Sequence, residues 1–438
     1  MRHLICGLEV HAELKTNSKM FCGCKNDPFG ASQPNIYTCP VCLGLPGALP
    51  VANKKAIEWT IQLGLALNCK INLFSKFDRK HYFYPDLPKA YQISQYDLPF
   101  CEHGFVETSE GRVRIRRIHL EEDTGKLLHK TINGEKVSLI DFNRSSVPLI
   151  EIVTEPDIHS ASQAKEYAKK LRQILRYLDI ANCDMEQGGM RLEANVSLAD
   201  SSDKLPNYKV EVKNINSFRF MEQAIAYEIV RQTEILDKSQ TPSQETRGWD
   251  MQKQVTYSQR VKEEAEDYRY FPDPDLPPIE FSQTQIDAMR KQLPELPDLI
   301  AQRWEQDLNI EQKNSVYFLE TQASALWADA VFTEAKRNKL EPNVVANLIV
   351  NKKVAVDQNT PIATVIEKVV TATQTDQIDP ELLNQAIDSI KKEFPTEWQR
   401  YQAGDKKLLG FFIGQLKKKV NQPLDPKQII ALLNEKGF

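Results

Sequence analysis

The first residues that could do chemistry are acids and a histidine set in apolar stretches. Glu9 and His11 stand two apart in Gly-Leu-Glu-Val-His, so on a strand their side chains share a face. Glu122 falls in a row of three acids after an alternating run, and Glu151 interrupts the apolar run 147–153. A buried carboxylate must be neutral or paired. We therefore expect these four residues to converge on a hard divalent cation, for which Mg²⁺ bridging to ATP phosphates is suitable.

A plainer explanation of the same residues is an ordinary set of buried salt bridges. The chain offers several arginines for this purpose, namely Arg79, Arg116, Arg117, Arg144 and Arg191. The sequence contains neither a P-loop nor a protein-kinase signature. An ATP site in this chain would therefore belong to another class of fold.

Four of the eight cysteines form a cluster with metal-site spacing. Cys22 and Cys24 are followed, after fourteen residues, by Cys39 and Cys42 in a Cys-Pro-Val-Cys turn. Two such arms can aim four thiolates at one zinc ion, although the first arm is one residue shorter than usual. Four thiolates would close the coordination shell, so the zinc should be structural. The alternative is four reduced thiols without a metal.

Strands and helices must position these residues. The alternating runs 112–120 and 136–142 predict strands. Helices are predicted over about 54–67, 161–178 and 218–236. Ser160 with Gln163 forms a capping-box pattern before the second of these. The Pro-rich stretch 271–278 cannot be a regular helix, and we expect it to be an extended segment leaving the first domain.

Beyond that stretch the sequence becomes helical. We expect a mixed domain over 1–293, a helical domain over 294–377 and a small helical tail over 378–438, with the polar segment 371–377 as a linker. The formal net charge of −4 gives no global basic field. The chain has no apolar run long enough for a membrane span and no secretory leader. These features favour a cytoplasmic protein, or an organellar one whose transit peptide has been removed.

The expected tail has two helix starts, at Asp379-Pro380 and Asp425-Pro426. Between them, 405–419 reads as an amphipathic helix that ends in the basic cluster Lys417, Lys418 and Lys419. Such a cluster suits contact with an RNA backbone. It is equally the pattern of a solvated helix end that the helix dipole favours.

Long segments of the chain closely resemble the GatB family, the B subunit of bacterial and organellar glutamyl/aspartyl-tRNA amidotransferases. They include GLEVHAELKTNSKMFCGC, TCPVCLGLPGALPVAN, DFNRSSVPLIEIVTEPDI, VKNINSFRFMEQAI and EAEDYRYFPDPDLPP. The resemblance runs in family order from residue 7 to 278, and the C-terminal helices resemble the family's YqeY-like tail. It implies an α+β fold whose first domain is an antiparallel-sheet cradle of the glutamine synthetase and guanido kinase type.

The resemblance also implies a chemistry. The chain would use ATP and Mg²⁺ to phosphorylate the side-chain carboxylate of Glu on tRNA(Gln) or Asp on tRNA(Asn). Ammonia released from glutamine by the amidase, or A, subunit would then displace the phosphate, within a heterotrimer that includes a small C subunit. By position, Glu9, His11, Glu122 and Glu151 match the family's magnesium and ATP site. Lys80 and Lys89 match the ammonia route, and the four cysteines match a zinc site found in part of the family.

Two other functions are compatible with parts of the sequence. One is a non-catalytic, zinc-containing RNA-binding scaffold whose chemistry lies in a partner; the acids at Glu9 and Glu151 weigh against it. The other is a stand-alone amidase, for which the Gly/Ser-rich signature is missing. ATP hydrolysis that depends on mischarged tRNA would separate the first alternative from an enzyme.

Overall fold

The computed structural model describes residues 2–201, 205–261, 267–373 and 380–420. The chain forms two compact units, the first comprising Met1–Gln302 with Leu319–Gln322 and the second Arg303–Phe318 with Ala323–Phe438. The first unit mixes helices with a large sheet, and the second is helical in its described part. No described helix is both long and apolar enough to span a membrane.

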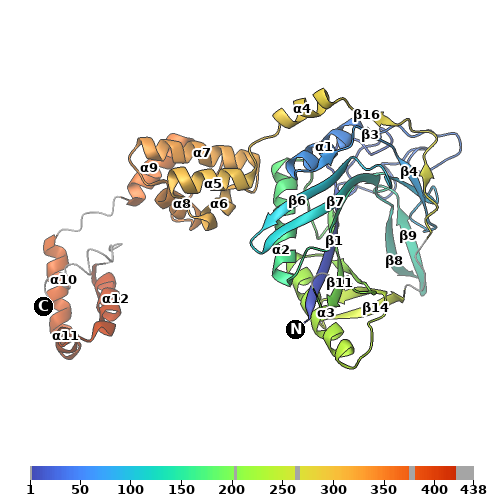
Figure 1. Cartoon of the computed structure of the whole chain (residues 1–438). Coiled ribbons are helices and arrows are strands. Elements are labelled where there is room, and N and C mark those ends of the chain that lie inside the picture. The colour runs from blue at the N-terminus through green and yellow to red at the C-terminus, as the bar shows by residue number, and fades with distance from the viewer. Residues whose placement is uncertain (1, 202–204, 262–266, 374–379, 421–438) are drawn as a thin grey trace. The chain divides into compact units, whose positions relative to one another are not determined.

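A nine-stranded sheet forms the frame of the first unit (Figure 1). Its strands, in spatial order, are β14 (Val255–Val261), β13 (Glu245–Asp250), β12 (Val210–Ile215), β11 (Met190–Ala199), β1 (His3–Glu13), β10 (Pro148–Thr154), β7 (Gly111–Glu122), β6 (Cys101–Thr108) and β2 (Lys70–Ile71). Neighbours run antiparallel except β12 and β13, which are parallel. Strand β1 lies at the centre, between β10 and β11. Strand β1, near the N-terminus, therefore pairs on both edges with strands that come more than a hundred residues later in the sequence.

Three helices pack on one face of this sheet: α1 (Lys54–Ala66), α2 (Ala161–Tyr177) and α3 (Phe218–Asp237). Their bounds confirm the three helices predicted from the sequence to within one residue at each end. Ser160 caps α2 by accepting the Gln163 backbone N–H at 2.9 Å. The Gln163 side chain accepts from the His159 backbone N–H, one residue earlier than a capping box requires. Apolar side chains of the helices and strands form one core, which leaves the other sheet face free for polar residues.

Smaller sheets complete the first unit. They are β4 (Asp78–His81) with β5 (Tyr91–Ser94) and β15 (Phe271–Pro272), β3 (Phe74–Ser75) with β16 (Ile279–Glu280), and the hairpin of β8 (Lys126–Ile132) and β9 (Glu135–Asp141). The stretch 271–278 is not helical, as predicted, but it does not leave the domain. Strand β15 pairs with β4, β16 pairs with β3, and α4 (Gln283–Lys291) follows against α1. Backbone pairing and the apolar side chains of Ile279 and Met289 tie this segment to the core.

The remaining helices are α5 (Pro297–Leu308), α6 (Gln312–Phe318), α7 (Gln322–Arg337), α8 (Pro342–Val350), α9 (Ile362–Thr373), α10 (Pro380–Glu393), α11 (Pro395–Gln402) and α12 (Leu409–Val420). Trp304 packs edge-on against Phe332, with ring centroids 5.1 Å apart. A separate apolar cluster of α10 to α12 includes Trp398 and Phe412. The predicted helix starts at Asp379-Pro380 and Asp425-Pro426 involve residues 379 and 425–426, which lie outside the described residues.

Candidate active site

Strand register places a histidine and a glutamate side by side at the centre of the sheet. His11 of β1 is opposite Glu151 of β10, and Glu151 is opposite His119 of β7. Residues at paired positions project to the same face of a sheet. Leu8 and Val10 belong to the apolar core, so alternation places His11 on the opposite face, away from the helices.

Four side chains meet on this face. The His119 Nε2 atom lies 3.1 Å from a Glu151 carboxylate oxygen and 3.6 Å from one of Glu121. The His11 Nε2 atom lies 3.5 Å from Glu151. Potential ligand atoms of His11, Glu121 and Glu151 all lie within 4.8 Å of one another. Such a group, with two carboxylates and an imidazole, could hold a divalent cation.

Electrostatics keep these carboxylates ionised. Burial alone would raise the pKa of Glu151, but the His119 charge and hydrogen bonds from both histidines hold it well below its usual value. Burial likewise opposes ionisation of Glu121, whereas a hydrogen bond from His119 and the Lys80 charge lower its pKa. In return the two carboxylates raise the pKa of buried His119 to about 9, against the effect of burial. The two carboxylates are therefore ionised, and the positive charges of His119 and Lys80 help to balance them.

Glu122 does not join this cluster, and Glu121 takes the place that the sequence assigned to it. Consecutive residues of β7 face opposite sides, so Arg117, His119 and Glu121 share the face of Glu151 and Glu122 does not. The Glu122 carboxylate instead pairs with Lys89 and accepts the Ile93 backbone N–H at 3.0 Å. The sequence could have indicated Glu121 in place of Glu122, because His119 and Glu121 repeat the two-residue spacing that identified Glu9 and His11.

Glu9 belongs to a neighbouring acidic group with Glu193 and Glu211. It accepts a hydrogen bond from the Asn195 amide at 2.7 Å. Lys213 lies 3.0 Å from Glu193 and 3.6 Å from Glu211, so this group already contains a cation. The predicted set therefore divides: His11 and Glu151 meet, whereas Glu9 and Glu122 each have other partners. The sequence reasoning overlooked Glu193, although it alternates with Arg191 and Asn195 along β11.

The five arginines considered for salt bridges pair mainly with other acids. Asp123 is 2.8 Å from Arg191 and 3.8 Å from Arg144. Arg79 pairs with Asp273, and Arg116 pairs with Glu155. The Arg117 Nε atom lies 3.4 Å from the His119 Nδ1 atom. Over the described ranges, none of these arginines forms an ion pair with the three predicted acids Glu9, Glu122 and Glu151.

Both lysines assigned to the ammonia route lie near the acids. Lys89 and its partner Glu122 are almost fully buried, with side chains 9% and 3% exposed. The Lys80 amine lies 5.0 Å from the centre of the Tyr268 ring. Burial disfavours its charge, but Glu121 and Glu151 raise the pKa of Lys80 overall. Lys80 is therefore a charged ammonium group and cannot serve as a base at neutral pH.

All four cysteines of the cluster come together, with sulfur atoms within 4.8 Å of one another. The Cys39 backbone N–H donates to the Cys42 sulfur at 3.1 Å, and the Lys19 amine lies 3.8 Å from the same sulfur. A hydrogen bond from Cys22 and the charge of Lys19 lower the pKa of the Cys42 thiol to about 5. The group has the ligand set of a zinc site with four cysteine ligands.

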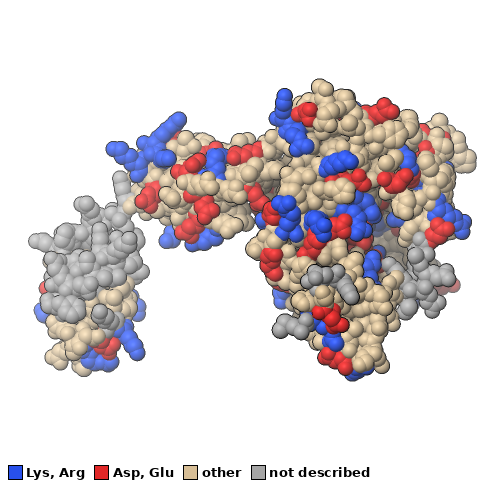
Figure 2. All heavy atoms as spheres, in the orientation of Figure 1, with Lys and Arg blue, Asp and Glu red and all other residues tan. Residues whose placement is uncertain are grey.

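The tail lysines differ in their surroundings. Lys418 and Lys419 are both exposed, and the Lys419 amine lies 2.6 Å from Glu393 and donates to Ser389 at 2.8 Å. The Lys417 side chain lies outside what the structure describes. Figure 2 shows Lys and Arg interspersed with Asp and Glu over the face in view. The basic character of the tail is therefore local.

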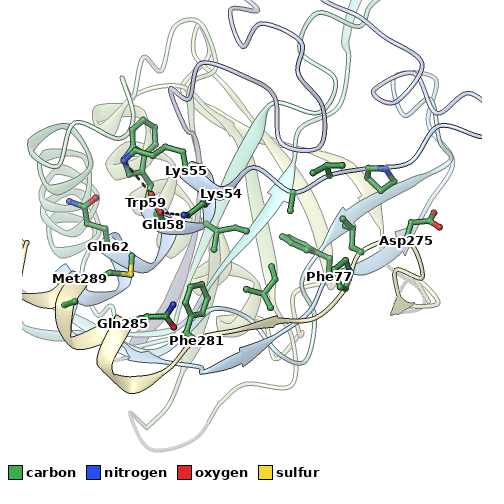
Figure 3. Close-up of a pocket in the computed structure, with 18 of the residues that line it drawn as sticks. Lys54, Lys55, Glu58, Trp59, Gln62, Phe77, Asp275, Phe281, Gln285 and Met289 are labelled. Carbon is green, nitrogen blue, oxygen red and sulfur yellow. Dashed lines mark ion pairs between the residues drawn. The ribbon is translucent and has the colours of Figure 1, made fainter.

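A large hollow on the first unit has a different character. It encloses about 1040 Å³ between α1, α4 and the segments 49–52 and 275–281 (Figure 3). Its walls are largely apolar, with Trp59, Phe281 and Met289 among them. None of the site residues predicted from the sequence lines it. It lacks a cluster of acids and histidines, so we place the chemistry on the polar sheet face.

Comparison with known proteins gives consistent results along the chain. A family model described as the GatB/GatE catalytic domain matches residues 4–287, and one described as the GatB domain matches 343–436. A protein of Thermodesulfovibrio yellowstonii, named as the B subunit of aspartyl/glutamyl-tRNA(Asn/Gln) amidotransferase, is 43% identical, over 98% of each chain. Equally named proteins of Thermotoga maritima and Thermomicrobium roseum are 40% and 51% identical, over 97% and 74% of this chain and 96% and 68% of theirs.

Proposed function

Because this chain belongs to the family of aspartyl/glutamyl-tRNA(Asn/Gln) amidotransferase B subunits, we propose that it activates an amino acid carried on tRNA. The substrate is Glu on tRNA(Gln), Asp on tRNA(Asn), or both. An oxygen of the side-chain carboxylate attacks the γ-phosphorus of ATP, and ADP leaves. Ammonia then attacks the acyl carbon and phosphate leaves, which produces the amide.

The observation that carries this proposal is the buried group of His11, Glu121 and Glu151. Two carboxylates that remain ionised supply the hard oxygen ligands that Mg²⁺ prefers. The buried Nδ1 atom of His11 has no hydrogen-bond partner in the described part of the chain, so its ring is free to adjust toward a cation. When bound, Mg²⁺ would neutralise phosphate charge during transfer. A scaffold without chemistry would gain nothing from burying this charge, since burial of charges is costly.

Residues around the cluster suit the remaining tasks. His119 holds Glu121 and Glu151 in place through contacts at 3.6 and 3.1 Å. Lys80 stays protonated beside the same carboxylates, so it can attract the substrate carboxylate or a phosphate oxygen. We assign the passage of ammonia to the region of Lys80 and Lys89. Exclusion of water there would keep ammonia unprotonated and nucleophilic.

Other parts of the chain complete the proposal. We infer that Cys22, Cys24, Cys39 and Cys42 hold a structural zinc ion, because four sulfurs leave no position for a substrate. The polar sheet face, opposite the helices, supports a cradle of the glutamine synthetase and guanido kinase type. The helical second unit, including Lys417 to Lys419, would contact the tRNA backbone. The amidase (the A subunit) and the small C subunit would complete the enzyme.

The test uses the chain purified together with its amidase partner. Mischarged Glu-tRNA and Asp-tRNA are supplied separately with Mg²⁺ and γ-labelled ATP, without an ammonia donor, and uncharged tRNA is the control. We expect labelled phosphate on the aminoacyl group, or phosphate release that requires the mischarged tRNA, and the preferred tRNA identifies the substrate. Tight tRNA binding with no turnover of either substrate would instead favour the non-catalytic scaffold.

A further inference from the structure

A second hollow in the first unit is lined with aromatic rings. It encloses about 990 Å³ between the segments 81–86 and 267–271, with Thr124 at its margin. Five of its residues are Tyr or Phe, namely Tyr82, Phe83, Tyr84, Tyr268 and Phe271. None of these residues belongs to the cation cluster described above.

Two of the rings are presented to solvent. Phe83 is 82% exposed and Tyr84 is 62% exposed, although such rings ordinarily lose water when a protein folds. Their segment is held by its backbone, since Leu87 N–H donates to the Tyr84 carbonyl at 3.1 Å and His81 N–H to the Tyr268 carbonyl at 2.9 Å. The rings are therefore displayed on a fixed frame and can accept a flat apolar ligand face.

Polar groups beside the rings could form hydrogen bonds with the edge of such a ligand. Asp86 and Asp267 line the hollow and offer carboxylate oxygens, and Arg269 offers N–H donors. His81 stacks on Phe271 with ring centroids 5.2 Å apart. Its Nε2 atom is buried and has no hydrogen-bond partner among the residues described. Flat rings combined with donors and acceptors at the margin match the chemistry of a nucleobase.

The hollow adjoins the cation cluster through Lys80. The Lys80 amine lies 5.0 Å from the centre of the Tyr268 ring and 5.9 Å from that of Tyr82. These two rings meet edge to face at 6.3 Å. On its other side, Lys80 interacts electrostatically with Glu121 and Glu151. A ligand held by the rings would therefore lie next to Lys80, whose charge interacts with both carboxylates.

We propose that this aromatic hollow binds the terminal nucleobase of the RNA that carries the amino acid. The inference rests on the proposed function, which requires the aminoacyl group to reach the cation cluster. That group is attached to the last nucleoside, so a stacked terminal base would position the substrate carboxylate. ATP also contains a nucleobase, so the base of ATP is the other candidate ligand for this hollow.

Fluorescence tests the contact without any turnover. The 3′-terminal adenosine of an uncharged tRNA is replaced by 2-aminopurine, whose emission falls when the base stacks on an aromatic ring. We expect quenching when the complete amidotransferase binds, and loss of quenching in F83A and Y84A. Phe83→Trp should retain it. F74A, which removes another exposed aromatic ring outside the hollow, should also retain it.

Kinetics then separate the two sources of the base. Loss of one stacking partner should raise the KM for aminoacyl-tRNA by about 5- to 150-fold and leave the KM for ATP unchanged. Quenching of a 2-aminopurine nucleoside triphosphate but not of the labelled tRNA would overturn the assignment to RNA. Unchanged quenching of the tRNA in F83A and Y84A would overturn it as well. Because the fluorescence measurement needs no catalysis, it would stay decisive even if the proposed phosphorylation failed.

Discussion

Substitution of two adjacent glutamates separates the role of Glu121 from that of Glu122. In Glu121→Gln one of three potential cation ligands loses its charge, while the shape of the side chain is kept. Loss of a group one shell beyond a metal costs about 10- to 100-fold in metal affinity, so loss of a direct ligand's charge should cost at least about 100-fold. Glu122→Gln leaves the Lys89 ammonium buried without its carboxylate, which should lower the free energy of unfolding by about 3–5 kcal/mol.

Two independent measurements report the change in Mg²⁺ requirement and the change in stability. tRNA-dependent ADP formation is followed while free Mg²⁺ is varied at a fixed, saturating concentration of magnesium-bound ATP, and unfolding is followed in urea. We expect E121Q to need much more Mg²⁺, and E122Q to be less stable with an ordinary Mg²⁺ requirement. The reverse pattern, with the Mg²⁺ requirement shifted only in E122Q, would refute the assignment based on strand alternation.

Three further changes test other parts of the structure. Cys42→Ser removes one of four clustered sulfurs and should abolish stoichiometric zinc in metal analysis of the purified protein. Glu228→Gln removes a fully buried carboxylate that binds two arginines, and should lower the free energy of urea unfolding by about 3–5 kcal/mol. Gly44→Ala should destabilise more than Gly47→Ala: both have positive φ, which costs about 1–3 kcal/mol, but only a Cβ at Gly44 meets Lys89, at 2.4 Å.

Local sequence patterns were sufficient for the helices. The apolar spacing of α2 is reproduced by the buried residues Ala164, Ala168 and Leu171, because an amphipathic helix needs only its own sequence and a core to face. The stretch 271–278 shows the limit of local information. Proline excludes a helix there, but only pairing with β4 and the packing of the following residues determine that the segment stays in the first unit.

The candidate site shows the same limit at the scale of single residues. The sequence placed His11 and Glu151 together correctly, because each interrupts an apolar strand. Three successive acids stand at 121–123, and it is the alternation along β7, already visible in the two-residue spacing of His119 and Glu121, that separates Glu121 from Glu122. Glu193 and Lys213 come from strands whose neighbours in the sheet are set by long-range pairing. Their meeting with Glu9 could not be read from any local pattern.

The central place of β1 in the sheet has a consequence for how the protein is made. This strand leaves the ribosome well before its two partners, which are β10 at 148–154 and β11 at 190–199. At about 5–20 residues per second, β1 would wait roughly 10–40 s before both partners have been synthesised. During that time its apolar residues and both of its backbone edges lack their native neighbours, so nascent chains of this protein should be clients of chaperones that bind exposed strands.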